Sequence, residues 1–328
     1  MPANPDGNRF QICPRTRTVR GQARSYTHAH NDCIMNAKPH RNTIFLEDAE
    51  ILRHQAYPAG QYVLRVQAPQ CAAKAKPGSF AHLQCDPQLP MRRPLSIMRV
   101  SASAGWVDFL YKAVGDGTRL LAQRKVGERI NVLGPIGTPF TPDPLRPRTL
   151  LLGGGVGIPP MVFLAEQLRA TPDQWQPLVL MGSEVPFPFT ARPSQILVPG
   201  LPDGVIAAMP LLDDWGIASR LASLQGYPGC YQGYITDLAR AWLNTLSAQS
   251  RNEVMLFACG PHAMLKACAA LAREFELPCQ VSLEEYMACA VGGCAGCTVE
   301  VMTPNGPAMK RVCVDGPVFD ATTVFNSM

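Results

Sequence analysis

Four cysteines near the carboxyl end are the residues whose types and spacing point most directly to chemistry. Cys289, Cys294 and Cys297 follow the pattern C-x4-C-x2-C, and Cys313 comes after fifteen further residues. Thiolates hold plant-type [2Fe–2S] clusters with this spacing. Only glycine, alanine and one valine separate the first three cysteines in "CAVGGCAGC", so backbone N–H groups can approach the sulfides. The sequence therefore predicts an iron–sulfur site held by Cys289, Cys294, Cys297 and Cys313.

Three other interpretations of these cysteines remain open. Zinc favours close cysteine pairs that occur twice, whereas only one close pair stands here. Disulfides suit small exported chains, and this chain is long and carries no export signal. Inert core cysteines are not expected in a glycine-rich loop. The remaining eight are scattered and are interpreted mostly as small core residues: Cys13, Cys33, Cys71, Cys85, Cys230, Cys259, Cys268 and Cys279.

A glycine turn marks a second candidate site, for a nucleotide. The apolar run at 149–152 leads through Gly153, Gly154, Gly155 and Gly157 into an amphipathic helical pattern. Glycines allow close approach of a pyrophosphate, and a helix N-terminus favours its charge. A tight turn without a ligand stays possible, because the strict G-x-G-x-x-G pattern is absent.

Another strand end is expected to complete the nucleotide site. Cys259, Gly260 and Pro261 follow the apolar run "VMLFA" and open a helical pattern, and ligands of α/β sheets bind at such strand ends. No Arg or Lys stands at Gly182-Ser183-Glu184 to meet a ribose 2′-phosphate. The sequence therefore favours NADH over NADPH.

The elements that must position these sites divide the chain into modules. Residues 1–41 form a polar extension, and residues 42–147 hold short apolar runs typical of an antiparallel β-barrel. After the proline-rich break at 139–148, strands and helices alternate over 148–280, which predicts an α/β domain with a parallel sheet. Residues 281–328 form a small cluster domain. The predicted fold is therefore multidomain α+β.

Composition excludes several classes of function. The chain has 328 residues, of which 47% are hydrophobic and 17% charged, and a net charge of +5. It has no basic block of the kind that binds nucleic acid and no apolar run long enough to span a membrane. Without a secretory signal the protein is expected to be cytoplasmic. No side-chain arrangement for acid–base or nucleophilic catalysis stands out, so no catalytic residue is assigned.

Three short segments in the barrel region resemble the FAD-binding domain of the ferredoxin reductase superfamily. They are "RPLS" at 93–96, "GDGT" at 115–118 and "GPIG" at 134–137. The glycine turn and Cys259-Gly260-Pro261 are similar to the nicotinamide domain of that superfamily. The resemblance implies FAD, and it implies that these residues contact the FAD: Arg93, Pro94, Leu95, Ser96, Leu110, Tyr111, Lys112, Gly117 and Thr118.

The order of the modules and the ending "KRVCVDGPVF" resemble the electron-transfer subunits of two-component, NAD-dependent dihydroorotate dehydrogenases. This resemblance implies electron transfer between NADH, FAD and a [2Fe–2S] cluster, and on to the FMN of a separate catalytic subunit, in pyrimidine biosynthesis. It also implies a heterotetramer with two copies of each subunit. The alternatives are a reductase subunit serving a hydrogenase, a glutamate synthase-like or a ferredoxin-linked complex, and a non-catalytic module that holds zinc.

Overall fold

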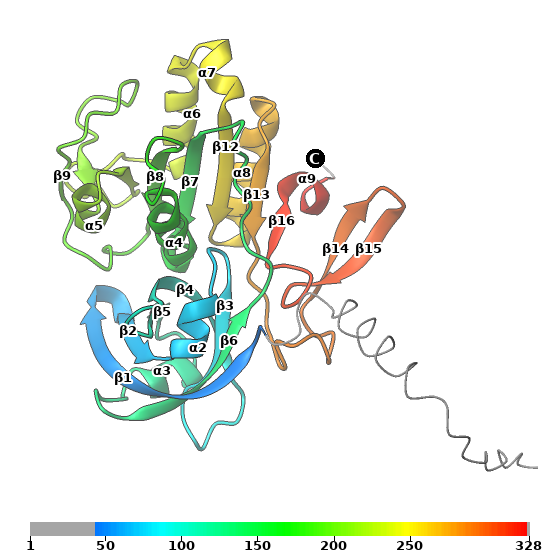
Figure 1. The fold of residues 1–328 in the computed structure, drawn as a ribbon. Coiled ribbons are helices and arrows are strands. Elements are labelled where there is room, and N and C mark those ends of the chain that lie inside the picture. Colours follow the sequence, from blue (N-terminus) through cyan, green and yellow to red (C-terminus); the bar gives the residue numbers. More distant parts are fainter. Residues whose placement is uncertain (1–42, 327–328) are drawn as a thin grey trace, which may run out of the picture. The chain divides into compact units, whose positions relative to one another are not determined.

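The computed structural model of the protein describes residues 43–326. The extension predicted over residues 1–41 lies outside this range. Within it, the chain forms first a closed barrel, then a mixed sheet covered by helices, and finally a cysteine loop with a hairpin (Figure 1). The predicted order of an antiparallel barrel, an α/β domain and a C-terminal cluster segment is confirmed.

The barrel closes because its strands alternate between inward apolar and outward residues. Val107, Phe109 and Tyr111 point into the core, while their neighbours face outward. The strands join in the order β1-β2-β5-β4-β3-β6, with every neighbouring pair antiparallel. They are β1 (Phe45–Tyr57), β2 (Gln61–Gln67), β3 (Phe80–Gln84), β4 (Arg93–Ser101), β5 (Trp106–Lys112) and β6 (Arg129–Ile136).

Short helices accompany the barrel strands. The Glu47 carboxylate accepts hydrogen bonds from the backbone N–H groups of Gln70 and Cys71, at 3.0 and 2.8 Å, and so caps the first turn of α2. Cys71 and Leu121 of α2 and α3 are buried in the barrel core. The helical segments are η1 (Pro58–Gly60), α2 (Pro69–Lys74) and α3 (Asp116–Leu121).

The second sheet has the order β11-β8-β7-β12-β13-β16. Its strands are parallel apart from β16, which runs antiparallel to β13 at one edge. The sequence predicted a parallel sheet; the antiparallel edge strand comes from beyond the cysteine loop. The strands are β7 (Arg148–Gly154), β8 (Gln176–Gly182), β11 (Ala218–Ala222), β12 (Val254–Cys259), β13 (Cys279–Ser282) and β16 (Val318–Asp320).

Helices cover both faces of this sheet, which explains the uninterrupted apolar run in β7. Leu150 and Leu152 pack on the side of α6 and α8, whereas Leu151 packs on the side of α4. The helices and minor strands are η2 (Gly155–Gly157), α4 (Ile158–Leu168), α5 (Pro210–Asp214), α6 (Ile235–Thr245), α7 (Ala248–Asn252), α8 (His262–Glu274), β9 (Arg192–Pro193) and β10 (Ala207–Ala208).

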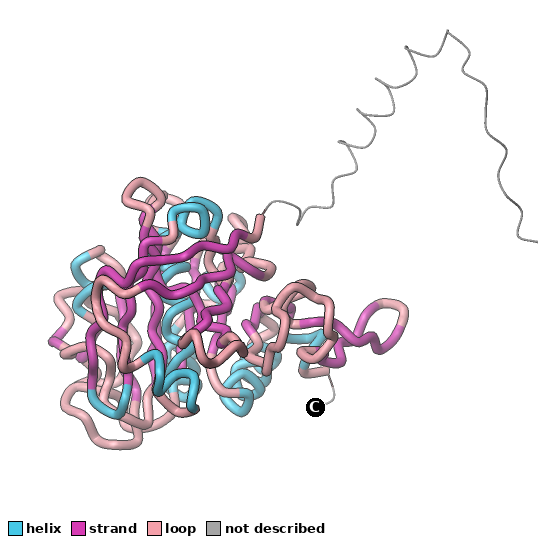
Figure 2. Tube along the Cα trace, turned by 90° about the horizontal axis from the view of Figure 1, so that it is seen from below, coloured by secondary structure: helices cyan, strands magenta, loops and turns pink. Residues whose placement is uncertain are grey.

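The C-terminal segment leaves the sheet after β13 and returns to it. Residues 283–297 contain no helix or strand, and a hairpin follows that Figure 2 shows as magenta strands apart from the others. The segment then rejoins β13 through β16. Its elements are β14 (Thr298–Thr303), β15 (Gly306–Arg311), β16 and α9 (Ala321–Val324). No helix between residues 43 and 326 has both the length and the apolar character to cross a membrane.

Candidate functional site

The cysteine loop, residues 289–297, has a backbone suited to an anion. Ala290, Gly292 and Ala295 adopt left-handed conformations, with φ of 57°, 79° and 55°. Left-handed residues between right-handed ones turn successive N–H groups to one side and form a concavity for negative charge. Alanine adopts this conformation at a cost in energy, so local stability of the loop does not explain its backbone conformation, whereas binding of an anion would.

Backbone N–H groups of this loop and of Cys313 donate hydrogen bonds to cysteine sulfurs. The N–H of Cys294 donates to Cys289 Sγ at 3.4 Å, that of Gly296 to Cys294 Sγ at 3.4 Å, and that of Cys313 to Cys297 Sγ at 3.5 Å. Burial alone would raise the pKa of the Cys289 thiol, but backbone N–H groups of the loop outweigh it and lower that pKa to about 7. The loop therefore stabilises a thiolate.

The four sulfurs form two pairs of different exposure. Cys297 and Cys313 are buried and hydrogen-bonded to each other, and burial followed by this neighbour raises the pKa of Cys313 to about 12. Cys289 and Cys294 form the outer pair, with Cys294 exposed. Over residues 43–326 no three His, Cys, Asp or Glu side chains lie close enough together to hold a metal ion, so the four cysteines stand as two separate pairs. Two pairs of thiols suit a binuclear centre that takes two thiolates on each iron.

Arg311, at the end of β15, holds the loop from the side. Its Nη1 donates to the Gly292 carbonyl at 3.0 Å, and its backbone N–H and Nε donate to one carboxylate oxygen of Asp315 at 2.8 and 3.2 Å. The guanidinium also interacts electrostatically with Cys313 and Cys297. It thus places a positive charge beside the buried sulfur pair.

On the barrel, two parts of the predicted FAD site meet. A side chain at Gly117 would place its Cβ 2.8 Å from Nε of Arg93 and 3.0 Å from its Cζ, so the guanidinium lies directly on the first turn of α3. Thr118 closes that turn: its hydroxyl accepts from the N–H groups of Val114 and Gly115, each at 3.1 Å. An arginine beside a helix N-terminus is a suitable cradle for a pyrophosphate.

The remaining predicted FAD residues differ in what they can offer. Pro94 and Ser96 are half-buried on β4, whereas Leu95 between them packs against the barrel core. Leu110 is buried on the outer face against α4. The Tyr111 side chain points into the barrel, where it is 1% exposed and its hydroxyl lies 2.8 Å from His54 Nε2. Only the backbone of Tyr111 can therefore contact a ligand, while Lys112 lies half-buried at the end of β5.

The glycine turn and Cys259-Gly260-Pro261 are brought together at the carboxyl ends of β7 and β12. A Cβ at Gly157 would lie 2.2 Å from the carbonyl oxygen of Cys259, so only glycine permits this contact. Gly154 approaches Pro261 and Met264 in the same way. Gly153 ends the strand, and the backbone of Gly155 (φ 55°) has open space before it. These strand ends form one edge at which a nucleotide can bind.

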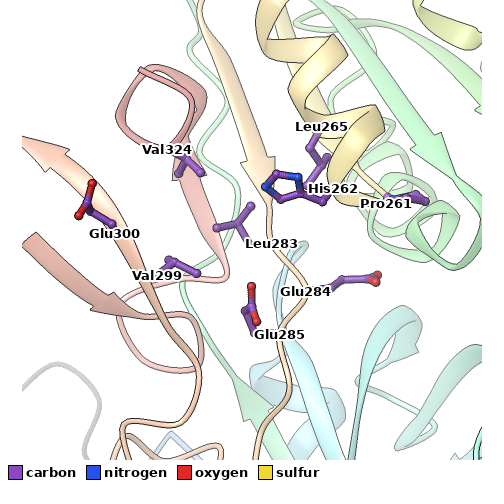
Figure 3. A pocket seen from close by; sticks show the side chains of 10 residues that line it. Pro261, His262, Leu265, Leu283, Glu284, Glu285, Val299, Glu300 and Val324 are labelled. Atoms are coloured by element: carbon purple, nitrogen blue, oxygen red, sulfur yellow. The ribbon is translucent and has the colours of Figure 1, made fainter. Parts of the chain in front are cut away.

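A cavity of about 360 Å³ adjoins Gly260 and Pro261 (Figure 3). Glu284 and Glu285 line it from the loop after β13, and Glu300 lines it from β14; the Glu284 side chain points away from the other two (Figure 3). His262 lines the same cavity but stacks edge-on against Phe325, with ring centroids 5.3 Å apart, as expected of a structural histidine. The cavity joins the predicted nucleotide edge to the hairpin of the cluster segment.

Sequence reasoning missed three residues around these sites. Arg311 stands two residues before Cys313, so its position beside a predicted ligand is a signal that could have found it. Glu284 follows β13 at the same sheet edge as the glycine turn. His82 carries no local signal, because its neighbours come from distant parts of the chain.

Comparison with known proteins gives consistent results. A family model described as the iron–sulfur cluster binding domain of dihydroorotate dehydrogenase B matches residues 284–325. The dihydroorotate dehydrogenase B (NAD(+)) electron transfer subunit of Desulforamulus reducens is 33% identical over 281 residues, which cover 84% of this chain and 97% of that protein. The Geobacillus sp. (strain WCH70) subunit of the same name is 33% identical over 285 residues, covering 85% and 98%. The solved NADH-dependent reduced ferredoxin-NADP oxidoreductase is similar with a TM-score of 0.68 and 25% identity, covering 85% of this chain and 90% of that one.

Proposed function

Since the chain belongs to the family of dihydroorotate dehydrogenase B (NAD(+)) electron transfer subunits, we propose that it carries electrons between NADH and the FMN of a separate catalytic subunit. The route within the chain runs through FAD and a [2Fe–2S] cluster. The protein acts in the cytoplasm, in pyrimidine biosynthesis, as part of a heterotetramer with two copies of each subunit. The proposed modules are a barrel at 42–147, a nicotinamide domain at 148–280 and a cluster domain at 281–328.

The chemistry comes from the cofactors, and the chain positions them. When bound, FAD takes two electrons from NADH as a hydride and releases them singly, which allows a one-electron cluster to be fed from a two-electron donor. Arg93 and the first turn of α3, with Gly117 and Thr118, hold the FAD pyrophosphate. Pro94, Ser96, Leu110 and Lys112 line the flavin, together with the backbones of Leu95 and Tyr111, whose side chains pack in the barrel.

The nicotinamide nucleotide binds at the edge formed by β7 and β12. The turn at 153–157 receives its pyrophosphate, and Cys259, Gly260 and Pro261 border the nicotinamide. Cys259 is fully buried, and burial raises its thiol pKa well above the ordinary value. A neutral thiol beside the nicotinamide does not compete as a nucleophile.

The cluster loop carries the proposal most directly. Backbone N–H groups point at three of the four cysteine sulfurs, and the sulfurs are paired two and two. The outer pair of cysteines, Cys289 and Cys294, lies at the surface. Cys294 is exposed there, as are Tyr286 (95% exposed) and Val291 (50% exposed). We expect the catalytic subunit to bind over this surface, near Gly292 and Gly293. Family membership favours this acceptor over hydrogenase or glutamate synthase-like partners.

Co-purification with the catalytic subunit tests the function as a whole. The complex is expected to reduce orotate with NADH, and its reduced form to show the paramagnetic resonance signal of a binuclear iron–sulfur centre. The isolated chain is expected to show flavin absorption and a red-brown shoulder. A colourless protein that contains zinc would contradict the proposal and support the regulatory alternative.

Replacement of Cys294 by serine separates the two halves of the electron route. Cys294→Ser is expected to abolish NADH-linked orotate reduction, because the cluster loses a ligand, while reduction of an artificial flavin acceptor stays within about twofold. Cys230→Ser, at a half-buried cysteine of another part of the fold, serves as the matched control and is expected to keep both activities. Equal loss of both activities in a folded, FAD-loaded Cys294→Ser protein would contradict the order of transfer.

A further inference from the structure

Arg99 stands on β4 three residues after the FAD segment and points away from the barrel core. Ile97 and Val100 pack in or against that core, and the register of β4 with β5 shifts between Ile97 and Arg99. Such a shift marks a β-bulge, which adds one residue to a strand and re-aims its side chains. Met98 and Arg99, neighbours in the sequence, therefore both project from the outer face of the barrel.

The outer face of β4 receives α4, the helix that follows the glycine turn. α4 packs along β4 in the space between the barrel and the sheet (Figure 1). Phe163 from the middle of α4 is buried with the barrel core, and Glu166 lies three residues later on the same side of the helix. Nε and Nη2 of Arg99 donate to Glu166 Oε1 at 3.1 and 2.7 Å. An ion pair therefore joins β4 directly to α4.

This ion pair is largely shielded from solvent. The side chains of Arg99 and Glu166 are 22% and 18% exposed. The Arg99 guanidinium also lies over two indole rings, with Cζ 4.9 Å from the ring centroid of Trp215 and 5.6 Å from that of Trp106. Aromatic faces attract a cation, and more strongly where little water competes. The guanidinium is thus held by a carboxylate of α4, by a ring of the barrel and by the ring that follows α5.

Two further arginines extend this arrangement in both directions. In the barrel, Arg65 of β2 lies 3.6 Å from the Trp106 ring centroid and donates to both carboxylate oxygens of Asp108, at 2.6 and 2.7 Å. At the end of α4, Arg169 lies 4.5 Å from the Trp215 ring centroid. Arginine and tryptophan therefore alternate from the barrel to the α/β module. The arginine–tryptophan ladder consists of Arg65, Trp106, Arg99, Trp215 and Arg169.

The ladder connects the two elements that carry the proposed cofactor sites. β4 holds the FAD residues 93–96 at its beginning and Arg99 near its end. α4 begins directly after the glycine turn at 153–157 and holds Glu166 in its last turn. Sites built on helices and strands are positioned more precisely than sites on loops. Because α4 is held to the barrel at both Phe163 and Glu166, its position and its angle against β4 are fixed together.

Apolar packing alone would hold the two modules together without charges. Met98, Leu110 and Ile158 already share one buried cluster across this interface. Burying an ion pair is costly unless its geometry is good, and an apolar residue would fill the same space. A planar guanidinium, however, binds its carboxylate and its rings in defined directions, which apolar contacts do not. The ladder therefore suits alignment of the modules better than it suits their stability.

We propose that Arg99 is a positioning residue that aligns the nicotinamide with the flavin, because its contacts with Glu166 and the ladder fix the nucleotide turn of α4 against the FAD segment of β4. This inference rests on the proposed function. Hydride transfer requires that the reacting atoms stand close to one productive geometry, and a small displacement from it slows the reaction strongly. Arg99 itself undergoes no chemical step.

Two substitutions at one position test the alignment. Arg99→Met keeps an apolar stem and loses the ion pair and the ring contacts, whereas Arg99→Lys keeps a charge for Glu166. In the full-length, FAD- and cluster-loaded protein, rapid mixing with a series of NADH concentrations separates the saturating rate of flavin reduction from the Kd of NADH. The saturating rate is expected to fall about tenfold in Arg99→Met and to recover in part in Arg99→Lys, with the Kd within about twofold in both.

A second variant and a control accompany this pair. Glu166→Gln removes the carboxylate from the helix side, and it is expected to slow flavin reduction at least about threefold with the same Kd, whether or not Arg99→Met folds. Arg148→Met is the matched control. Arg148 begins β7 and pairs with Glu253 at 3.0 Å within the α/β module, with its side chain 31% exposed. Its replacement is expected to leave both the rate and the Kd unchanged.

A further measurement does not depend on turnover. Amide hydrogen exchange of residues 209–217, which include Trp215, is expected to be faster in Arg99→Met than in Arg99→Lys, because the indole loses a cation that holds it to the barrel. Arg148→Met is expected to leave this exchange unchanged. The same exchange in Arg99→Met as in the unaltered protein would overturn the proposed link between the modules.

The failures of the two proposals are distinguishable. If NADH reduces the flavin of the unaltered protein, an equal saturating rate in Arg99→Met, or an equal fall in Arg148→Met, would overturn the role of Arg99 alone. An unaltered, FAD-loaded protein that NADH does not reduce would overturn the proposed function and this inference with it.

Discussion

At the scale of single residues, the proposed FAD site depends on a glycine, whose lack of a side chain leaves room for an arginine. Gly117 lets the Arg93 guanidinium lie against the first turn of α3, where a Cβ would come within 2.8 Å of Nε. The guanidinium and the N-terminal N–H groups of α3 then lie next to each other, and a pyrophosphate could bind to both. The conformation of one arginine is thus set by a glycine more than twenty residues away.

Gly117→Ala is expected to weaken FAD binding about tenfold, because the displaced guanidinium loses a charge-assisted hydrogen bond to the phosphates. Serial dilution of the FAD-loaded protein, with released FAD measured by its fluorescence, gives the affinity. Gly115→Ala is the control two residues earlier, where a Cβ meets nothing within 4 Å. A Gly117→Ala protein that retained FAD as tightly as Gly115→Ala would show that Arg93 does not bind the phosphates.

The buried His82 also predicts a dependence of stability on pH. Its pKa is lowered to about 4 in the folded protein by burial and Arg92, with a smaller effect of Arg93, against about 6.5 when unfolded. The unfolded chain therefore binds the proton more tightly, and stability falls as pH drops below 6.5. Between pH 7 and pH 5 the unaltered protein is expected to lose about 2 kcal/mol more unfolding free energy than His82→Met. Parallel urea titrations of the two proteins at both pH values check this, and identical losses would contradict it.

Individual residues could be singled out where they form a motif with a recognisable spacing along the sequence. The four cysteines, Cys289, Cys294, Cys297 and Cys313, were singled out by their spacing, and the structure pairs their sulfurs. Their role as cluster ligands stays a prediction. Tyr111 was assigned by resemblance, but strand alternation sends its side chain into the barrel. His82 was not predictable as a buried group with a lowered pKa, because its burial comes from strand register and the charge beside it from Arg92.

At the scale of elements, the β14–β15 hairpin positions the charge that faces the cluster. Arg311 ends β15, binds the Gly292 carbonyl and Asp315, and lies near Cys297 and Cys313. A reduced cluster carries one more negative charge than an oxidised one, so a nearby cation stabilises the reduced form.

Arg311→Gln is therefore expected to make the cluster reduction potential more negative by roughly 40 mV, the equivalent of about 1 kcal/mol for one electron. A redox titration followed by paramagnetic resonance measures this shift. Arg240→Gln removes a cation that pairs with Asp237 and Glu274 on the α6–α8 surface and is expected to leave the potential unchanged. A potential that moved equally in both variants would rule out a specific role for Arg311.

Elements with strong periodicity were predictable, and short ones were not. The strand at 149–152 and the following helix appear in the structure as β7 and α4. The predicted amphipathic pattern of this helix was wrong, because nine of its eleven residues are buried between the sheet and the barrel. The edge strand β16 has three residues, which is too few to show alternation. Its pairing with β13 is decided by the return of the chain from the cysteine loop.

At the scale of the whole molecule, the order of the modules carried the identification. The glycine turn and the barrel segments were ambiguous alone, but a barrel, a nucleotide-binding sheet and a cysteine loop in this order, with the ending "KRVCVDGPVF", resembled one family among reductases of similar architecture. The relatives confirm that resemblance. The contacts between modules could not be predicted. They arise because the outer face of the barrel, with Phe80 and Ile136, shares one buried cluster with the cysteine segment.

This shared core constrains how the protein matures. Phe80 of β3 and Ile136 of β6 contribute to the buried cluster that also holds Met287, Cys297 and Cys313, so this cluster is complete only once the barrel has closed. The nascent chain delivers those strands well before residues 287–313 leave the ribosome, and N-terminal parts fold first during synthesis. We therefore expect iron to be inserted last, after the barrel has folded and the cysteine segment has packed against the rest of the chain.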